Sequence, residues 1–128
     1  MNISHVAIWA QDIELLRDFY CRHFGASAGP RYYNPAKEFS SYFLTFPGGG
    51  ASLEIMNVPG LVACGTSGIS RGFCHMAISV GSPRLVDEFT GRLCAAGVTV
   101  VSPPRTTGDG FYESVIADPE GNLIELTA

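Results

Sequence analysis

The chain repeats part of its own sequence, and this repeat limits the fold more than any other feature. When the chain is laid on itself so that His5 meets His75, "HVAI" at 5–8 aligns with "HMAI" at 75–78. With one inserted residue, "GASLEI" at 50–55 also aligns with "GNLIEL" at 121–126. The matches keep their order along each half, so we predict two copies of one supersecondary unit.

The two copies are expected to form one domain. Module 1 covers about residues 1–56, module 2 covers about 72–128, and a linker rich in Gly and Ser joins them at about 57–72. A chain of 128 residues suits a single domain of residues 1–128.

Each module is predicted to form a strand, a helix and three further strands. Asp12 and Ser82 are good helix N-caps, apolar residues follow at helical spacing, and Gly25 and Gly97 end the two helices. The predicted strands lie at 3–9, near 28–34, near 41–46 and near 51–57 in module 1, and at 73–80, near 98–102, near 112–117 and near 122–127 in module 2. Two tandem βαβββ modules indicate the α+β class.

Two histidines and two glutamates occupy matching places in the modules. Side chains alternate between the faces of a strand, so the large aliphatic residues should meet the helices while His5 and His75 point to the opposite face. Glu54 and Glu125 follow the same alternation in the last strands. A carboxylate among large aliphatic residues is costly unless it is paired. Two such carboxylates, each with a matching histidine, predict one shared divalent metal ion.

The predicted ligand set is His5, Glu54, His75 and Glu125. Two imidazoles and two carboxylates suit Zn or Ni, and also Fe, Mn or Co, better than Ca. The alternative is that each histidine is an ordinary hydrogen-bonded residue and each glutamate is solvated. The matched spacings, 54 − 5 = 49 and 125 − 75 = 50, favour the metal. His23 has no such partner and is interpreted as a surface or helix C-terminal residue.

Composition excludes several classes of protein. With 46% hydrophobic and 16% charged residues, the chain is too apolar to be disordered. The net charge of −4, without a run of like charges, argues against nucleic-acid binding. No apolar run is long enough for a membrane span, and the N-terminus does not resemble a secretory signal. The spread of Cys21, Cys64, Cys74 and Cys94 indicates reduced thiols, and we expect a cytoplasmic protein.

The paired modules and the four candidate ligands resemble the vicinal oxygen chelate superfamily, which contains glyoxalases, bleomycin resistance proteins and dioxygenases. "DPEGNLIEL" at 118–126 resembles the closing segment of that family, and "HVAIWAQDIELLRDFYCRHFG" at 5–25 resembles its opening segment. The resemblance covers essentially the whole chain. It implies a cupped mixed sheet around one metal site and a homodimer, often with each site built from both chains.

The His/Glu/His/Glu set is most similar to that of bacterial glyoxalase I. This similarity implies a lactoylglutathione lyase-like proton transfer through a metal-stabilised ene-diolate, with Glu125 as the leading base and Glu54 as a ligand that shares the proton work. The chain departs from that pattern at two places. Trp9 stands where such enzymes have an arginine, and Val58 stands where they often have an asparagine, with Asn57 one place earlier. The use of glutathione is therefore left open.

Three residues are candidates for contact with a small-molecule substrate. Trp9 either stacks on an aromatic or apolar substrate or packs in the wall of a pocket. Asn57 is the nearest match to the family's asparagine. Arg105 lies in "PPRTTGDGFYE" at 103–113, where it either binds a carboxylate or phosphate or is a solvated residue of an ordinary flexible connection.

Three classes of function follow from the sequence. The first is a metal-dependent lyase or isomerase of glyoxalase type. The second is an extradiol dioxygenase or a resistance transferase of the same fold. The third is a non-catalytic protein that sequesters a small toxic molecule, and the intact ligand set argues against it.

Overall fold

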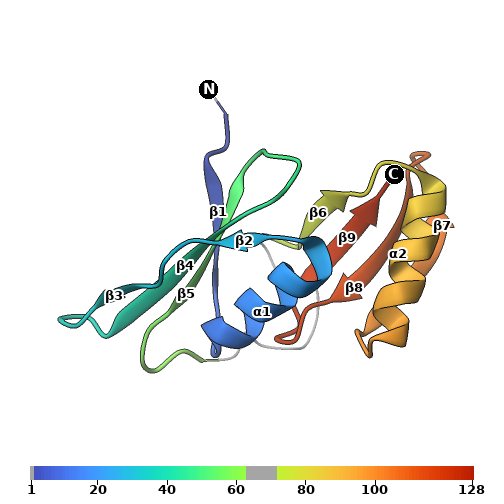
Figure 1. Cartoon of the computed structure of the whole chain (residues 1–128). Coiled ribbons are helices and arrows are strands. Elements are labelled where there is room, and N and C mark those ends of the chain that lie inside the picture. Colours follow the sequence, from blue (N-terminus) through green and yellow to red (C-terminus); the bar gives the residue numbers. More distant parts are fainter. Residues whose placement is uncertain (1, 63–71) are drawn as a thin grey trace. The chain divides into compact units, whose positions relative to one another are not determined.

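The computed structural model describes residues 2–62 and 72–128 of the chain, which divides into two compact units (Figure 1). Unit 1 is Met1–Ser67 and unit 2 is Gly68–Ala128. Most of the linker predicted at 57–72, with Cys64, lies outside the described residues. Cys21, Cys74 and Cys94 are free thiols.

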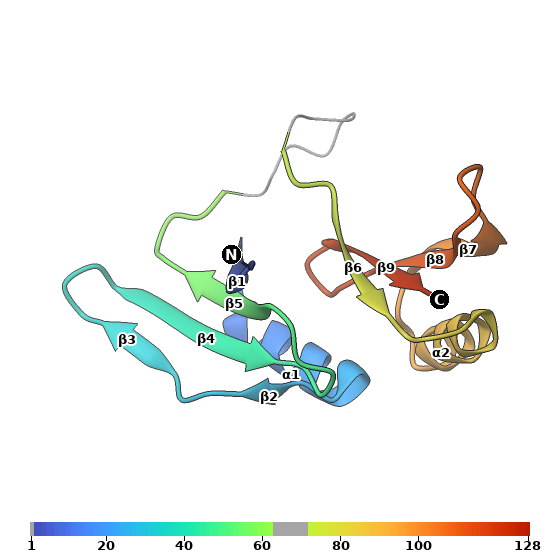
Figure 2. The ribbon, with the colours of Figure 1, turned by 90° about the horizontal axis from the view of Figure 1, so that it is seen from above.

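Unit 1 is a mixed sheet with one helix on it. Its elements are β1 (His5–Trp9), α1 (Ile13–Phe24), β2 (Ser27–Ala28), β3 (Tyr32–Asn34), β4 (Phe39–Thr45) and β5 (Ser52–Asn57). The strand order is β1-β5-β4-β2, and β3 also pairs with β4. β1 and β5 are parallel, whereas the other pairs are antiparallel. Figure 2 shows α1 lying along one face of this sheet, so the opposite face is not covered by a helix of the unit.

The strand predicted near 28–34 is two short strands. β2 and β3 both pair with β4 and are separated by residues 29–31. Pro30 has no N–H to give to a ladder, which accounts for the break. Gly29 keeps the chain beside β4 across this break, because its N–H donates to the carbonyl of Phe43 at 2.9 Å.

Unit 2 repeats this plan without the break. Its elements are β6 (His75–Ser79), α2 (Pro83–Ala95), β7 (Val100–Thr106), β8 (Tyr112–Ala117) and β9 (Leu123–Thr127), with the strand order β6-β9-β8-β7. The parallel pairs of the two units match, because Ala7 lies opposite Glu54 on β1 and β5, and Ala77 lies opposite Glu125 on β6 and β9. The predicted repeat of βαβββ modules is confirmed.

The flexible connection considered for residues 103–113 is mostly a β-hairpin. β7 runs on to Thr106, and β8 begins at Tyr112. Pro103 and Pro104 lie in the edge strand β7, where only the N–H groups that point toward β8 are needed for the ladder. The pairing with β8 shifts register between Ser102 and Arg105, where the two prolines lie.

Both helices begin and end where the sequence predicts. The side chain of Asp12 accepts the backbone N–H groups of Glu14 and Leu15, at 3.0 Å each. Ser82 accepts the N–H of Leu85 at 3.3 Å. Beyond the helices, Gly25 and Gly97 have φ values of 66° and 84°, which favour glycine. Among the described residues, no helix is long and apolar enough to cross a membrane.

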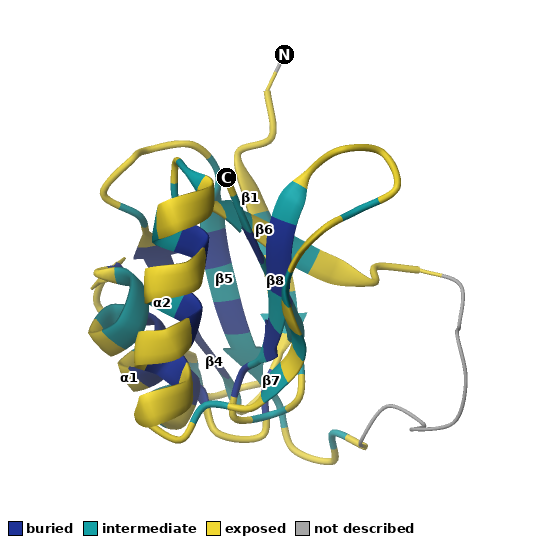
Figure 3. Ribbon diagram, turned by 90° about the vertical axis from the view of Figure 1, so that its right-hand side faces the viewer, coloured by how far each residue is buried: buried dark blue, intermediate teal, exposed yellow. Residues whose placement is uncertain are grey.

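Each helix buries its apolar stripe against one face of its own sheet, and Figure 3 shows the buried side of α2 turned toward the strands. The buried hydrophobic residues on these elements are Ile13, Leu16, Phe19, Tyr20, Tyr42, Leu44, Leu53 and Ile55 in unit 1, and Val86, Leu93, Ile116, Ile124 and Leu126 in unit 2. In unit 2 the hydroxyls of Thr90 and Ser114 form a buried hydrogen bond of 2.6 Å. The residues that alternate with these cores lie on the opposite face of each sheet, called here the open face.

Candidate functional site

The open face of unit 1 carries one histidine and one glutamate close together. Because Ala7 lies opposite Glu54, His5 is the diagonal neighbour of Glu54 on the same face. The His5 Nε2 and Glu54 Oε2 atoms are 3.9 Å apart. The imidazole is 44% exposed, whereas the carboxylate is only 14% exposed.

Unit 2 holds the equivalent pair in the same way. His75 is the diagonal neighbour of Glu125 across β6 and β9, and Nε2 and Oε2 are 3.3 Å apart. As in unit 1, the imidazole is the more exposed of the two side chains, at 39% against 18% for the carboxylate. The structure therefore brings the four predicted ligands together as two His–Glu pairs. Within residues 2–62 and 72–128, no three His, Cys, Asp or Glu side chains form a metal-binding group.

The donor atoms of each pair fit a divalent transition metal. An imidazole nitrogen and a carboxylate oxygen are the donor types that Zn²⁺ and its neighbours bind. Each carboxylate is mostly withdrawn from water and has an imidazole nitrogen beside it. Two ligands are fewer than the three or four protein ligands usual for zinc, so one pair alone does not complete such a site.

Aromatic rings share the open face of unit 1 with the His–Glu pair, and Phe43 contacts His5. The rings of His5 and Phe43 meet edge to face with centroids 5.3 Å apart. Trp9 meets Phe39 edge to face at 6.3 Å, and Phe39 contacts Tyr32 at 6.0 Å. Of these rings only Trp9 was predicted from the sequence, because the pairing of β4 with β5 and β3 puts the other rings on the open face.

Arg105 is held by two side chains. Its Nη1 donates to Ser102 Oγ at 2.8 Å, and its Nη2 donates to Glu113 Oε1 at 3.1 Å. Glu113 is buried, with 8% exposure, and lies on the same face of β8 as Val115, which is opposite Glu125. Sequence reasoning missed Glu113, and the only available signal was a carboxylate in an otherwise apolar strand.

Asn57 lies at the end of β5 and holds the turn that leads from β1 to α1. Its Nδ2 donates to the carbonyl of Ala10 at 2.7 Å and to that of Gln11 at 3.2 Å. Asn57 lies opposite Ser40. It is three positions after Glu54 on β5, so its side chain lies on the helix side of the sheet, whereas that of Glu54 lies on the open face. His23 packs its ring on Phe19 of the same helix, with centroids 5.0 Å apart.

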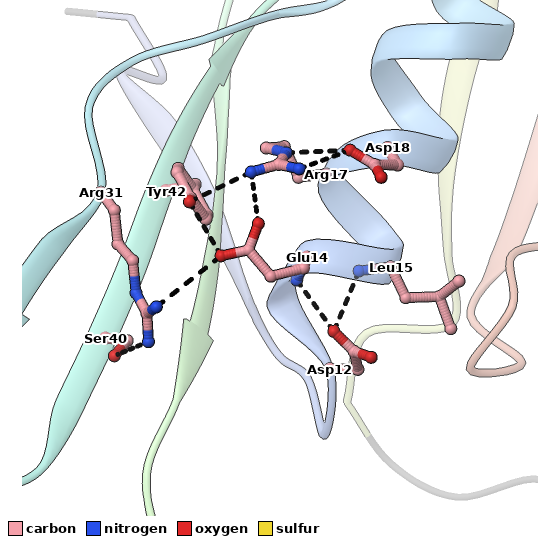
Figure 4. A network of polar contacts seen from close by, with 8 residues as sticks. All are labelled: Asp12, Glu14, Leu15, Arg17, Asp18, Arg31, Ser40 and Tyr42. Carbon is pink, nitrogen blue, oxygen red and sulfur yellow. Dashed lines mark hydrogen bonds and ion pairs between the residues drawn. The ribbon is translucent and has the colours of Figure 1, made fainter.

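The helix side of unit 1 holds a polar network (Figure 4). The hydroxyl of Tyr42 donates to Glu14 at 2.9 Å and accepts from Arg17 at 3.2 Å. Arg17 also pairs with Glu14 and Asp18, and its hydrogen bond to Asp18 is the largest of several effects that raise its pKa. Arg31 lies 3.8 Å from Glu14 and donates to Ser40. Both guanidinium groups are thus engaged on the side of the sheet away from His5.

Fold and site together define a small α+β protein made of two copies of one unit, each with a His–Glu pair on the open face of its sheet. The model of the Glyoxalase/Bleomycin resistance protein/Dioxygenase superfamily matches residues 2–126. The chain belongs to this superfamily, and the resemblance inferred from the sequence is confirmed.

Solved structures agree with this assignment. A glyoxalase family protein from Enterococcus faecalis is 26% identical, with a TM-score of 0.82 over 99% of this chain and 97% of that one. A mutant of the fosfomycin resistance protein FosX from Listeria monocytogenes, complexed with Mn(II) and a dihydroxypropylphosphonic acid, is 24% identical, with a TM-score of 0.71 over 99% and 91%. Comparison with curated proteins gave no match.

Glyoxalase I from Zea mays is also similar in structure. It is 21% identical, with a TM-score of 0.79, and the match covers 98% of this chain but only 44% of that enzyme. This chain therefore spans less than half the length of the maize protein. Because their sequence identity to this chain is so low, FosX and the maize enzyme support the fold alone.

Proposed function

We propose that this protein is a metal-dependent enzyme that transfers a proton on a small-molecule substrate, as a lyase or isomerase of glyoxalase type. The observation that carries the proposal is the duplicated His–Glu pair, placed by the same strand register on the open face of each sheet. A packing role would not require the same two polar residue types at the same two places in both units.

His5, Glu54, His75 and Glu125 are proposed to hold one divalent metal ion per site. Zn²⁺ or Ni²⁺ fits two imidazoles and two carboxylates, and Fe²⁺, Mn²⁺ and Co²⁺ are also compatible. When bound, the ion would act as a Lewis acid toward substrate oxygens. The two carboxylates balance its charge of +2. The complex of FosX with Mn(II) is an example of a similar fold that holds such an ion.

Glu125 is assigned as the leading base. Its carboxylate takes a proton from a hydroxyl-bearing carbon next to a substrate carbonyl. The electron pair of the broken C–H bond forms a C=C bond, and the π pair of the carbonyl moves onto its oxygen. The same carboxylate returns the proton to the former carbonyl carbon, and the hydroxyl proton passes to the former carbonyl oxygen, which completes an isomerisation without loss or gain of atoms. Glu54 shares this proton work from the equivalent place in unit 1.

Of the three candidate residues, Trp9 and Arg105 are proposed to contact the substrate, whereas Asn57 is proposed to act indirectly. Trp9 forms an aromatic wall on the open face of unit 1. Arg105, oriented by Glu113 and Ser102, keeps free N–H groups for a polar substituent. Asn57 acts by holding the turn after β1, which positions Trp9 at the end of that strand.

Metal binding is the first test of this proposal. Calorimetric titration of chelator-treated protein with Zn²⁺ or Ni²⁺ should give a stoichiometry of about one bound ion per chain. His5→Ala, His75→Ala and Glu54→Gln should each weaken binding at least tenfold, since each removes one ligand or its charge. His23→Ala and Glu88→Gln are matched controls, because they change the same residue types outside the proposed site. Full binding by His5→Ala would contradict the assignment.

Proton transfer is tested with a model α-hydroxyketone. Metal-loaded protein in D₂O should speed the exchange of the CH₂ protons of 2-hydroxyacetophenone, followed by NMR. Glu125→Gln should abolish this activity, because a carboxamide keeps the size of the residue but lacks the basicity. Full exchange by Glu125→Gln would rule out the base assignment. Protein purified with iron would favour the dioxygenase class, and protein that binds no metal would favour the non-catalytic binder.

A further inference from the structure

The open face of unit 2 holds a buried carboxylate that the proposed reaction does not use. Glu113 is only 8% exposed, although a glutamate is rarely so buried unless it is paired. It lies opposite Thr127 on β9, so it is the diagonal neighbour of Glu125 across β8 and β9. This carboxylate therefore lies next to the residue assigned as the leading base.

Arg105 is fixed beside this carboxylate. It lies opposite Glu113 on the edge strand β7, and its Nη2 atom is 3.1 Å from Glu113 Oε1. Its Nη1 donates to Ser102 Oγ at 2.8 Å, and its side chain is 45% exposed. A guanidinium has five N–H donors, so these two contacts fix its plane and leave other donors for a ligand.

Glu113 cancels the positive charge that Arg105 brings to this face. All four strands of unit 2 lie within the described residues, and Arg105 is their one Lys or Arg, whereas Glu113 and Glu125 are both acidic. With His75 neutral, these strands carry one positive and two negative charges. An anionic group bound to Arg105 would be repelled by the Glu113 carboxylate on the same guanidinium. An uncharged oxygen can accept the same N–H groups without that repulsion.

The neighbours of this ion pair also suit uncharged groups. Thr127 lies between Glu113 and Ser79 in the strand register, so hydroxyl-bearing residues continue the polar line from β8 across β9 to β6. Hydroxyls donate and accept hydrogen bonds but carry no charge. Because diagonal neighbours such as Glu113 and Glu125 have Cα atoms roughly 7–8 Å apart, a chain of about five carbon atoms can reach from Glu125 to Arg105.

We infer that Glu113 is a specificity-determining residue: by neutralising Arg105, it makes the open face of unit 2 bind an uncharged, oxygen-bearing end of the substrate and disfavour an anionic one. This inference rests on the proposed function for the place of the reacting carbon at Glu125, but the preference for an uncharged group does not depend on the metal. The substrate class is then a hydroxycarbonyl compound whose far end is an alcohol, ester or amide. The carboxylate or phosphate considered for Arg105 from the sequence is disfavoured.

Two ligands that differ in one charge test the inference. 5-Hydroxy-4-oxopentanoate has a hydroxyl-bearing carbon next to a carbonyl and a carboxylate at its far end, and its methyl ester lacks the charge. Each is titrated into the whole protein, once with chelator and once with added Zn²⁺. Binding is followed by the NMR signal of the Arg105 Nε–H group, which is identified by its loss in Arg105→Lys. Exchange of the hydroxymethyl protons in D₂O is measured separately with Zn²⁺.

Wild type should bind the ester at least fivefold more tightly than the acid. Glu113→Gln should tighten binding of the acid about tenfold and change that of the ester by less than about twofold, because the amide oxygen still accepts from Arg105 while the negative charge is gone. The double variant Glu113→Gln/Arg105→Gln should lose this gain.

Glu88→Gln is the matched control, and it should leave the preference for the ester unchanged. It removes the carboxylate of the Arg84–Glu88 ion pair on α2, so it alters the net charge of the chain by the same amount outside the open face. The comparison of the two ligands on wild type needs no variant, so it remains decisive if Glu113→Gln does not fold.

Three results would overturn the inference. They are binding of the acid by wild type that equals or exceeds that of the ester, an unchanged preference in folded Glu113→Gln, and no shift of the Arg105 signal with either ligand in both metal conditions. Preference for the ester without any proton exchange would instead uphold the role of Glu113 and count against the proposed function. Proton exchange without that preference would count against the role of Glu113 alone.

Discussion

At the scale of single residues, alternation along the strands decides the chemistry of each face. His5, Ala7 and Trp9 share one face of β1, while Val6 and Ile8 are less exposed and face the helix. The same pattern in β6 puts His75 on its open face. These placements were predicted from the period of two in a strand, and the exposures agree with them.

Replacing Trp9 by arginine tests its effect on substrate choice. We expect the wild-type protein to turn over the hemithioacetal of methylglyoxal and glutathione poorly, because Trp9 stands where the family resemblance places the arginine that grips a glutathione carboxylate. Trp9→Arg should raise kcat/KM for this substrate roughly tenfold, the effect of one charge-assisted hydrogen bond.

Trp9→Leu is the control, because it removes the indole without adding a charge. Efficient wild-type turnover that Trp9→Arg leaves unchanged would mean that a different residue binds glutathione. Steady-state kinetics at one metal concentration measure all three proteins.

At the scale of elements, polar contacts join each helix to its sheet beside the apolar core. Tyr42 links β4 to α1 through Glu14 and Arg17 in unit 1. In unit 2 the hydroxyl of Tyr112 on β8 donates to Asp87 on α2 at 2.8 Å. These contacts were not foreseen, because they join residues 25 or more positions apart.

The hydrogen bond between Tyr112 and Asp87 should make the free energy of unfolding depend on pH. The hydrogen bond to Asp87, followed by loss of solvation, raises the pKa of Tyr112 above 10.0. A raised pKa in the folded state contributes stability that is full below the unfolded pKa of about 10 and is lost as the pH rises through the folded pKa. Wild type should therefore be more stable than Tyr112→Phe at pH 7, and the difference should fade above pH 10.

Urea unfolding between pH 7 and pH 11 measures this difference. Tyr33→Phe is the control, because Tyr33 is exposed and should show no such trend. A gap between wild type and Tyr112→Phe that stays constant to pH 11 would contradict the assigned contact.

At the scale of the whole molecule, the repeat places one His–Glu pair in each unit. A site with four protein ligands therefore needs both kinds of unit, from one chain or from two. We expect a homodimer, as the family resemblance implies. Either one chain supplies His5 and Glu54 and the other supplies His75 and Glu125, or all four ligands of a site come from one chain.

Mixing two inactive variants tests this arrangement. If sites are shared, His5→Ala and His75→Ala chains should regain metal binding and activity after subunit exchange, because each mixed dimer has one intact site. No recovery despite proven exchange would place all four ligands on one chain, and a monomer in light scattering would exclude the dimer.

Features that depend on near neighbours could be predicted from the sequence without the folded chain. Helix ends follow from Asp12, Gly25, Ser82 and Gly97, whose side chains or φ angles act within one turn. The faces of β1 and β6 follow from alternation, and the module order follows from the repeat. The four candidate ligands could be predicted because each module repeats a histidine and a carboxylate among large aliphatic residues, where an unpaired charge is unfavourable.

The pairing of strands and its register, in contrast, emerge only in the folded chain. Ala7 meets Glu54 across 47 positions of sequence (54 − 7), and this register brings His5 and Glu54 within 3.9 Å. The rings around Trp9 and the Arg105–Glu113 pair likewise depend on how β4 and β8 align with their neighbours. The register between strands that are distant in sequence depends on side-chain packing across the whole sheet, so it cannot be read from the residues of one strand alone.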